Sequence, residues 1–402
     1  MLRVPIHKIE PGMVLARPIP QPNDPFRYLL QRDREISPTM VSRLEKLGIL
    51  EVWVRYPKLE FLEDVIEEGL GDRQREVYWH VRRNFETIMD DTAAQIDLSM
   101  FQTSITGLFD FMKQSRRGNI LLQKLDAFDN VLMSHSTNVC YLSLMLGMQL
   151  EQYLIEERRS KTARDAKDLK ELGLGCLLHD IGKMLVPPEI LNKPDKLTDD
   201  EYAEMKRHPV YGYEMLKGSV PAVAAQIVLN HHQRYEGDGY PTRVDRQTGE
   251  ELPALHGRQI PVVCRIATVC DVFDAATTAR CYSHAKPTIQ VLHEMHTCCN
   301  HFFDPTVLRA FTQIVPPFPI GQLVTLSDGT EAAVVDFNSR SPVRPKVQGI
   351  RTASGEEIQD PSLAEIDLAI HPDVEIASVD DVDVREFTRS LDENAAYTPM
   401  CV

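Results

Sequence analysis

Residues 172–183 read LGLGCLLHDIGK, and this stretch decides how the rest of the sequence is interpreted. It is apolar as far as Leu178, at helical spacing, and then places His179, Asp180 and Lys183 close together. A helix of this pattern carries an imidazole, a carboxylate and an amine into the protein interior. Buried polar groups need partners, and a divalent cation would satisfy both the imidazole and the carboxylate. A buried His–Asp hydrogen bond is the simpler alternative.

Further histidines and an aspartate stand on helix faces or at helix ends on both sides of this stretch. They are His135, on the apolar face of a helical pattern from Phe128 to Leu146; His208, before Pro209; His231 and His232, after an apolar helical stretch; and Asp271, on a helix predicted over 262–280. Taken singly, each has an ordinary alternative: a core histidine, a helix-flanking histidine or an exposed acidic face.

Taken together, these positions supply five histidines and two aspartates. Imidazole and carboxylate ligands without thiolates suit Zn, Fe, Mn or Ni better than an iron–sulfur cluster. Seven ligands exceed what one tetrahedral ion needs, so a two-metal site follows if one carboxylate bridges. Paired metals ~3.5–4 Å apart activate a water molecule and bind both oxygens of an in-line phosphoryl displacement.

Composition limits the classes of partner. The chain has 402 residues, of which 44 are Lys or Arg and 59 are Asp or Glu, giving a net charge of −15. A chain this acidic is a poor general binder of nucleic acid or anionic membrane, so a phosphate ligand would need local cations. We find neither an apolar run long enough to span a membrane nor a secretory signal. The eight cysteines form no C-x-x-C pair, which predicts reduced thiols in a cytoplasmic protein.

The hydrophobic pattern predicts a mainly α protein with a helical domain in the middle and smaller units at both ends. The predicted units are an α+β module at 1–66, amphipathic connecting helices at 72–118, an all-helical domain at 119–315, a small β-rich unit at 320–375 that opens with a hairpin, and a loose acidic tail at 376–402. The helices at 72–118 either pack against the next domain or mediate homodimerisation or signal transmission.

The ordered set of motifs resembles the HD-GYP domain, a bacterial branch of the HD metal-dependent phosphohydrolase superfamily whose members degrade cyclic di-GMP. The resemblance spans about residues 125–315. It rests on the metal-type residues above together with the loop Gly239-Tyr240-Pro241. It implies two divalent transition-metal ions, with Fe or Mn ahead of Ni, Co or Zn. It also implies hydrolysis of cyclic di-GMP to pGpG, GMP or both by a hydroxide that bridges the metals.

The resemblance also implies a role for each residue. Asp180 would bridge the metals; His135, His179 and Asp271 would complete one ion, and His208, His231 and His232 the other. Asp180 and Lys183 would be the catalytic residues, with Lys183 neutralising phosphate charge. Substrate contacts would come from Lys183, Gly239, Tyr240, Pro241, Arg280 and Lys286. GGDEF-type signalling proteins would be partners at the Gly-Tyr-Pro loop.

The sequence departs from the family pattern at three places. Gln233 stands where Glu usually follows the two histidines; it is not at a ligand position, so we expect activity to survive. Val131 stands where members with three metals carry a ligating Glu, which favours two metals here. The group His293, His296, Cys298, Cys299 and His301 lacks clean metal-site spacing, and we do not expect a second site there.

Two other functions compete with a cyclic di-GMP phosphodiesterase. A non-catalytic receptor or scaffold would bind cyclic di-GMP without turnover, but such proteins usually lose a ligand, and all seven positions and Lys183 are present here. An HD phosphohydrolase for another nucleotide would not be expected to carry the Gly-Tyr-Pro loop.

Overall fold

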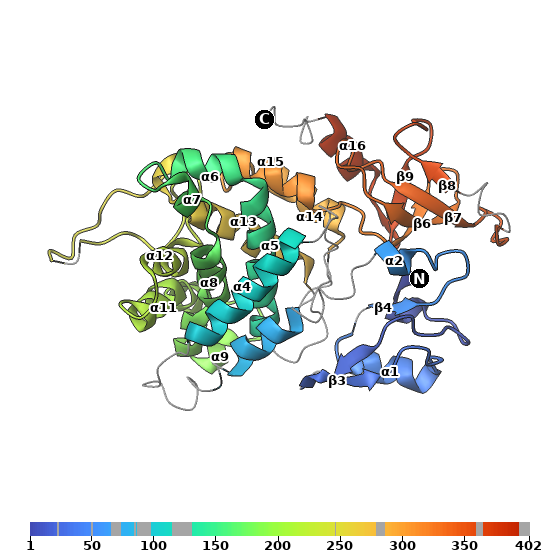
Figure 1. Ribbon diagram of the computed structural model, residues 1–402, viewed down its shortest axis with the longest axis horizontal. Helices are drawn as coiled ribbons and strands as arrows, with labels where there is room; N and C mark the ends of the chain where they lie inside the picture. Colours follow the sequence, from blue (N-terminus) through green and yellow to red (C-terminus); the bar gives the residue numbers. More distant parts are fainter. Residues whose placement is uncertain are drawn as a thin grey trace.

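The computed structural model describes residues 1–21, 24–49, 51–65, 74–83, 86, 98–114, 131–245, 247–278, 286–358 and 365–393. These residues form a helical domain and a smaller β-rich lobe, which lie on opposite sides of the view in Figure 1. The β-rich lobe contains both the blue N-terminal module and the orange-red C-terminal unit. The predicted fold class, a mainly α protein with small units at both ends, is therefore confirmed.

The helical domain is built from long central helices and short connecting ones. Its longer helices are α4 (Leu98–Gln114), α5 (Val131–Gln149), α8 (Lys170–Leu178), α11 (His208–Leu216), α12 (Ala222–Asn230), α13 (Val262–Thr277), α14 (Thr288–Thr297) and α15 (Pro305–Ile314). Its shorter elements are α6 (Glu151–Glu157), α7 (Ala163–Ala166), η2 (Ile181–Leu185), α9 (Pro188–Leu191), α10 (Asp199–Met205) and η3 (Gly257–Gln259).

Helix α8 lies at the centre of this domain. Every residue from Leu172 to Leu178 is buried, because α5, α12 and α4 pack around it. Helix α13 packs against α5 and also contacts α12 and α8. The chain leaves α8 at His179 and Asp180, so the polar end of the predicted motif lies in the interior.

The connecting segment before α5 also packs inward. Residues 74–83 are helical, and Val77, Val81, Phe101 and Ile105 are buried in the same core as α8. The packing alternative for residues 72–118 is thus observed for the part of this segment that the structure describes. Homodimerisation through it stays a prediction.

A glycine allows the close approach of η2 and α11. A Cβ atom at Gly182 would lie 2.0 Å from the carbonyl oxygen of His208 and 2.4 Å from the backbone nitrogen of Gly212. Only glycine lets the two backbones approach this closely. The contact brings the turn that carries Asp180 next to the first residue of α11, His208.

The C-terminal unit is a six-stranded antiparallel sheet of order β10-β9-β5-β6-β7-β8. Its strands are β5 (Leu323–Leu326), β6 (Glu331–Asp336), β7 (Lys346–Arg351), β8 (Glu365–Asp367), β9 (Ile376–Val379) and β10 (Val382–Asp383), followed by α16 (Arg385–Glu393). The predicted hairpin at its start is confirmed, with Leu323 paired to Ala333.

The loose acidic tail predicted from residue 376 is wrong over residues 376–393. Asp380 and Asp381 have positive φ angles of 47° and 67° and form the turn between β9 and β10. Ile376 and Val379 of β9 and Leu391 of α16 have buried side chains. The acidic residues therefore occupy an exposed turn, while the apolar residues between them join the core.

The N-terminal module combines two small sheets with a helix. Its elements are β1 (Leu2–Pro5), η1 (Ile6–Lys8), β2 (Ile19–Gln21), β3 (Asp24–Leu30), α1 (Pro38–Lys46), β4 (Glu51–Val54) and α2 (Leu62–Val65). Strand β1 pairs antiparallel with β4, and β2 with β3. The Ser37 side chain caps α1 by accepting a hydrogen bond from the backbone nitrogen of Met40.

The N-terminal module and the C-terminal sheet share one hydrophobic core. Ala333, Val335 and Ile350 of the sheet pack with the buried residues of the module. The backbone nitrogen of Arg3 also donates to the carbonyl of Gly321 at 2.8 Å. The two end units are therefore joined in one lobe.

Candidate metal centre

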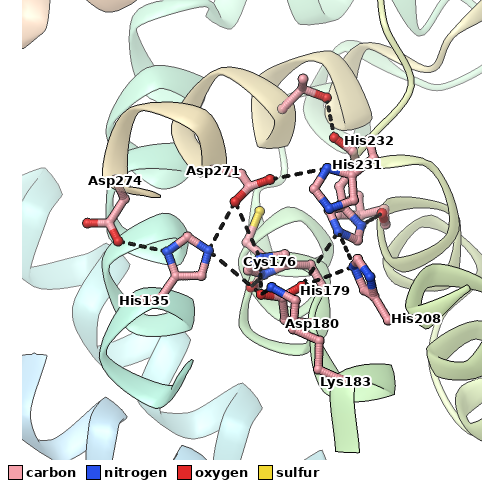
Figure 2. A network of polar contacts seen from close by, with 12 residues as sticks. His135, Cys176, His179, Asp180, Lys183, His208, His231, His232, Asp271 and Asp274 are labelled. Carbon is pink, nitrogen blue, oxygen red and sulfur yellow. Dashed lines mark hydrogen bonds and ion pairs between the residues drawn. The ribbon is translucent and has the colours of Figure 1, made fainter. Parts of the chain in front are cut away.

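The structure brings all seven predicted metal-type residues into one buried cluster (Figure 2). They arrive from five places: His135 from α5, His179 and Asp180 from the α8–η2 junction, His208 from the start of α11, His231 and His232 from the residues after α12, and Asp271 from α13. Because each stands on a helix or at its end, packing around α8 fixes their relative positions.

Asp180 lies between two groups of histidines. Its Oδ1 atom is 3.2 Å from His208 Nε2 and 3.8 Å from His231 Nε2. Its Oδ2 atom is 3.4 Å from His179 Nε2 and 3.8 Å from His135 Nε2. One carboxylate therefore presents each of its oxygens to a different set of imidazoles.

Asp271 faces the same cluster from α13. Its Oδ1 atom is 3.0 Å from His135 Nε2 and 3.9 Å from His179 Nε2, and its Oδ2 atom is 3.6 Å from His232 Nδ1. The donor atoms form three groups, each within 4.8 Å: Asp180 with His208, His231 and His232; His135 with His179 and Asp180; and His179 with His231 and Asp271.

Backbone carbonyls orient three of the imidazoles by accepting from Nδ1. The pairs are His179 with Cys176 at 2.7 Å, His208 with Met205 at 2.8 Å, and His231 with Val228 at 2.9 Å. Each bond leaves Nε2 free to act as a metal donor, which is the usual arrangement around a protein-bound metal.

Asp274 is a functional residue that the sequence analysis missed. Its Oδ2 atom lies 2.8 Å from Nδ1 of His135, and the side chain is buried. It therefore orients His135 as the carbonyls orient the other imidazoles. The sequence feature that could have indicated this role is the position of Asp274 three residues after Asp271, which places both on the same helix face.

The cluster favours neutral imidazoles and ionised carboxylates. Burial lowers the pKa of His179, His231 and His232, the last to about 3. Burial alone would raise the pKa of Asp180, but its surroundings, with the ammonium group of Lys183 as the largest opposing effect, lower that pKa well below its usual range. These are the protonation states in which both residue types bind metal.

His135 differs from the other imidazoles. Burial lowers its pKa, but hydrogen bonds to Asp271 and Asp274 outweigh burial and raise it to about 9. In the ion-free cluster the proton on His135 thus offsets part of the carboxylate charge.

The donor set fits divalent metal ions. Among the residues that the structure describes, His179 Nε2 and Asp180 Oδ1 are fully buried polar atoms without a hydrogen bond. A buried polar atom left unbonded costs about 1–3 kcal/mol, and metal coordination removes that cost for both atoms. Imidazole and carboxylate donors are those that divalent transition metals prefer. The cluster can therefore hold metal ions.

Lys183 and the Gly-Tyr-Pro loop lie at the edge of the cluster. The Nζ atom of Lys183 is 2.5 Å from Asp180 Oδ2. The ring of Tyr240 lies on that of His232, with centroids 4.6 Å apart and planes 33° apart. Pro241, which follows across a cis peptide, and Gly239 complete this loop. The structure thus places four of the six predicted substrate residues beside the cluster.

Arg280 lies outside the described residues. Lys286 is half-exposed and forms an ion pair with Glu294 of α14, at 2.7 Å. The contacts described for the cluster do not include Lys286, so its substrate role stays a prediction. The side chain of Val131 also lies outside the part of the chain that the structure describes. The prediction of two metals, which used this position, therefore stays a prediction.

The histidines after residue 290 occupy separate positions. His293 packs its ring against Phe387 of α16, and His301 Nδ1 lies 2.5 Å from Glu236 Oε2. Of the described residues, the metal-type groups include only the seven cluster residues.

Two family models match separate parts of this chain. Residues 142–307 match the family model of the HD domain, and residues 323–386 match that of the KOW domain associated with HD domain. The second match also extends beyond residue 375, where the acidic tail was predicted to begin.

Curated relatives carry the names of cyclic dinucleotide phosphodiesterases. Cyclic di-GMP phosphodiesterase PA4108 of Pseudomonas aeruginosa is 37% identical over 237 residues, covering 58% of this chain and 51% of the relative. Cyclic di-GMP phosphodiesterase response regulator RpfG of Xanthomonas campestris is 40% identical over 172 residues, covering 42% and 40%. The 3'3'-cGAMP-specific phosphodiesterase 2 of Vibrio cholerae is 36% identical over 135 residues, covering 33% and 24%. The chain thus spans about half the length of these relatives or less.

Proposed function

We propose that this chain, whose residues 142–307 form an HD domain, is a metal-dependent phosphodiesterase that hydrolyses cyclic di-GMP to pGpG, GMP or both. The observation that carries the proposal is the position of Asp180, which presents one oxygen to each of two histidine groups in a buried cluster. The names of the relatives at 37% and 40% identity support the choice of substrate.

The proposed cofactor is a pair of divalent transition-metal ions, Fe or Mn, with Ni, Co or Zn as the other candidates. Asp180 would bind both ions. His208, His231 and His232 would bind one, and His135, His179 and Asp271 the other. Two of the three donor groupings support this division, because Asp180 belongs both to the group with His208, His231 and His232 and to the group with His135 and His179. The third grouping joins His231 to His179 and Asp271 across the division.

The reaction follows from the charges around the cluster. Two divalent ions supply, when bound, a water of lowered pKa and positive charge for the phosphodiester. The buried imidazoles of His179 and His231 stay neutral and keep Nε2 available, while Asp180 and Asp271 stay ionised. Lys183 places an ammonium group beside Asp180, where it would offset the charge that develops on a phosphate oxygen as the P–O bond breaks.

Substrate binding needs local positive charge, because the chain carries −15 overall. Besides Lys183, we propose that Arg280 binds the second phosphate or a guanine edge with its planar fork, and that Lys286 adds charge nearby. Gly239, Tyr240 and Pro241 would form the wall of the substrate groove, and the stacking of Tyr240 on His232 supports this placement.

We further propose a cytoplasmic location, which the buried free cysteines at positions such as 140 and 176 support. Homodimerisation through residues 72–118 and recognition of GGDEF-type proteins by the Gly-Tyr-Pro loop complete the proposal. The structure contains no helix, in the residues it describes, with the length and hydrophobicity needed to cross a membrane.

A second substrate, 3'3'-cGAMP, is favoured by two relatives named for it at 36% and 37% identity. A non-catalytic receptor for cyclic di-GMP is the alternative of another class. Turnover assays with both dinucleotides on anaerobically loaded protein separate the three outcomes. Hydrolysis of cyclic di-GMP supports the proposal, and binding without hydrolysis of either dinucleotide would make the protein a receptor.

The Asp180→Asn variant tests the centre itself. The amide keeps the shape of the side chain but removes the negative charge that two cations would share, so we expect loss of metal and of turnover with the helical fold retained. Asp110→Asn, at an exposed position on α4, is the matched control. Metal analysis, circular dichroism and product chromatography provide the measurements. Full metal content with wild-type turnover in Asp180→Asn would refute the assignment.

Metal stoichiometry gives an independent test. Seven side chains that share one carboxylate suit two ions, so we expect close to two metals per chain after anaerobic loading. Inductively coupled plasma mass spectrometry on protein of known concentration measures the ratio. Three tightly bound ions would contradict the prediction and require a further ligand.

A further inference from the structure

Gln233 follows the two cluster histidines directly, and its side chain contacts the loop that follows them. It is only 4% exposed, and its Nε2 atom donates a hydrogen bond to the carbonyl oxygen of Pro241 at 2.8 Å. This bond joins the first and last parts of a segment that leaves the cluster at His232 and returns to it at Tyr240. A buried bond of this kind fixes the path of the segment between its two ends.

The backbone of the segment closes at the same point. The backbone nitrogen of Tyr240 donates to the carbonyl of His232 at 3.2 Å. A Cβ atom at Gly239 would lie 2.4 Å from the backbone nitrogen of Arg234 and 2.5 Å from the carbonyl oxygen of His232. Gly239 therefore allows a close return of the backbone, and the Gln233 side chain binds the chain just beyond it.

The result of this closure is the position of one aromatic ring. Tyr240 lies between Gly239 and Pro241, and its ring stacks on His232 at 4.6 Å and stands 6.4 Å from the ring of His208. Elsewhere the segment is anchored differently, since the backbone nitrogens of Tyr235 and Glu236 donate to the carbonyls of Phe302 and His301. Of the side-chain hydrogen bonds described within this segment, the Gln233–Pro241 bond is the one that ends on a residue adjacent to Tyr240 in sequence.

We propose that Gln233 is a positioning residue that holds Tyr240 over His232 by donating its amide hydrogen to Pro241. A carbonyl oxygen accepts hydrogen bonds only, so the partner must be a donor. An ionised carboxylate is acceptor-only, and the glutamate of the HD-GYP pattern could not make this bond in its charged form. The inference rests on the proposed function only in taking Tyr240 to face the substrate.

Two variants whose side chains are nearly as long as glutamine distinguish the loss of the hydrogen bond from the loss of packing. Gln233→Met keeps an unbranched neutral side chain without a donor, and Gln233→Glu keeps the shape but has no donor whenever its carboxyl is ionised. Gln348→Met is the matched control, because Gln348 is also buried, at 6% exposure, but stands in β7 of the C-terminal sheet. Amide exchange resolved to single residues, metal content and steady-state kinetics with cyclic di-GMP are measured for all three.

We expect the Tyr240 amide to exchange about fivefold faster in both Gln233 variants, the factor that corresponds to one neutral hydrogen bond of about 1 kcal/mol. The amides of Tyr235 and Glu236 should keep their rates, which provides an internal reference. The metal content should stay at the wild-type value, and KM should rise by a larger factor than kcat falls, because the groove wall rather than the metal cluster is loosened. The control should show none of these changes.

Wild-type exchange at Tyr240 in Gln233→Met and Gln233→Glu would overturn the proposal. Equal acceleration at Tyr235, Glu236 and Tyr240 would also overturn it, because it would show general loosening of the segment. The exchange readout needs no substrate. If the wild-type protein hydrolyses no cyclic dinucleotide, the proposed function fails, and the positioning role of Gln233 is still decided.

Discussion

At the scale of single residues, His296 differs from the histidines of the cluster. Its Nε2 atom is buried and, among the described residues, has no hydrogen-bond partner. Burial, with a smaller contribution from Arg309, lowers its pKa to about 4. The cluster imidazoles gain metal as a partner under the proposed function, whereas the buried atom of His296 gains none. Burial of His296 therefore lowers the free energy of unfolding by an amount that depends on pH.

We expect acid to destabilise the native protein through His296. The pKa of the His296 imidazole is 6.5 in the unfolded chain and about 4 in the native protein. Between these pH values the unfolded chain therefore binds a proton that the native protein does not bind. Stability then falls as pH is lowered from 6.5 to 4, by at most about 3 kcal/mol. His296→Leu should remove this part of the pH dependence in urea unfolding at pH 4.5 and 7.5.

The control is His371→Gln, a histidine substitution at an exposed position. An unchanged slope of unfolding free energy against pH in His296→Leu would contradict the prediction. The cluster histidines contribute the same background in all three proteins, so the comparison isolates position 296.

At the scale of elements, the approach of η2 to α11 brings two residues of the cluster together. Asp180 precedes η2 and His208 begins α11, and their facing atoms are 3.2 Å apart. The distance depends on Gly182, whose missing Cβ leaves room for the backbone of α11. The packing of η2 against α11 and the distance between Asp180 and His208 therefore both depend on Gly182.

Gly182→Ala should separate the two elements. The added methyl group would meet backbone atoms of His208 and Gly212, which cannot rotate away, so we expect a loss of about 1–3 kcal/mol or more in unfolding free energy and weaker metal binding. Gly147→Ala is the control, because its methyl group would meet only side-chain ends of Leu169 and Leu172. Denaturant unfolding and metal titration measure both effects. Equal behaviour of the two variants would show that the close approach at Gly182 is not critical.

The elements also show what a sequence can predict. The histidines and aspartates of the cluster could be predicted from the sequence because they are polar residues within otherwise apolar helical patterns, and such patterns indicate burial. The contact of Gln233 with Pro241 and that of Asp274 with His135 depend on how loops and helices return in space, which spacing along the chain does not encode. The acidic stretch at 380–383 was misread because composition does not show that its aspartates occupy a turn.

At the scale of the whole molecule, the units at 1–66 and 320–393 act as one body. Their shared core includes Val52 and Val54 of β4 together with Val335 and Ile350 of the sheet. A Cβ atom at Gly321 would lie 2.4 Å from the ring of Trp53, so the two units also touch closely at their edge. The sequence analysis separated them because nothing in the local pattern reports contacts between distant segments.

Ile350→Ala should therefore loosen both units together. Ile350 is 5% exposed, and truncating a buried isoleucine costs about 2–5 kcal/mol. Amide exchange in β4 and in β6 should accelerate by similar factors, because one core supports both strands. Ile227→Ala, in the helical domain, is the control and should leave β4 unchanged. Acceleration confined to the C-terminal sheet would show that the units unfold independently.

The shared core sets an order of events during synthesis. About 300 residues separate Val54 from Ile350, and a ribosome adds about 5–20 residues per second, so roughly 15–60 seconds pass between the emergence of the two halves. Throughout that interval the apolar face of the first module has no native partner, while the intervening helical domain can already fold. The nascent chain thus exposes this apolar face to solvent until the last strands of the sheet have left the ribosome.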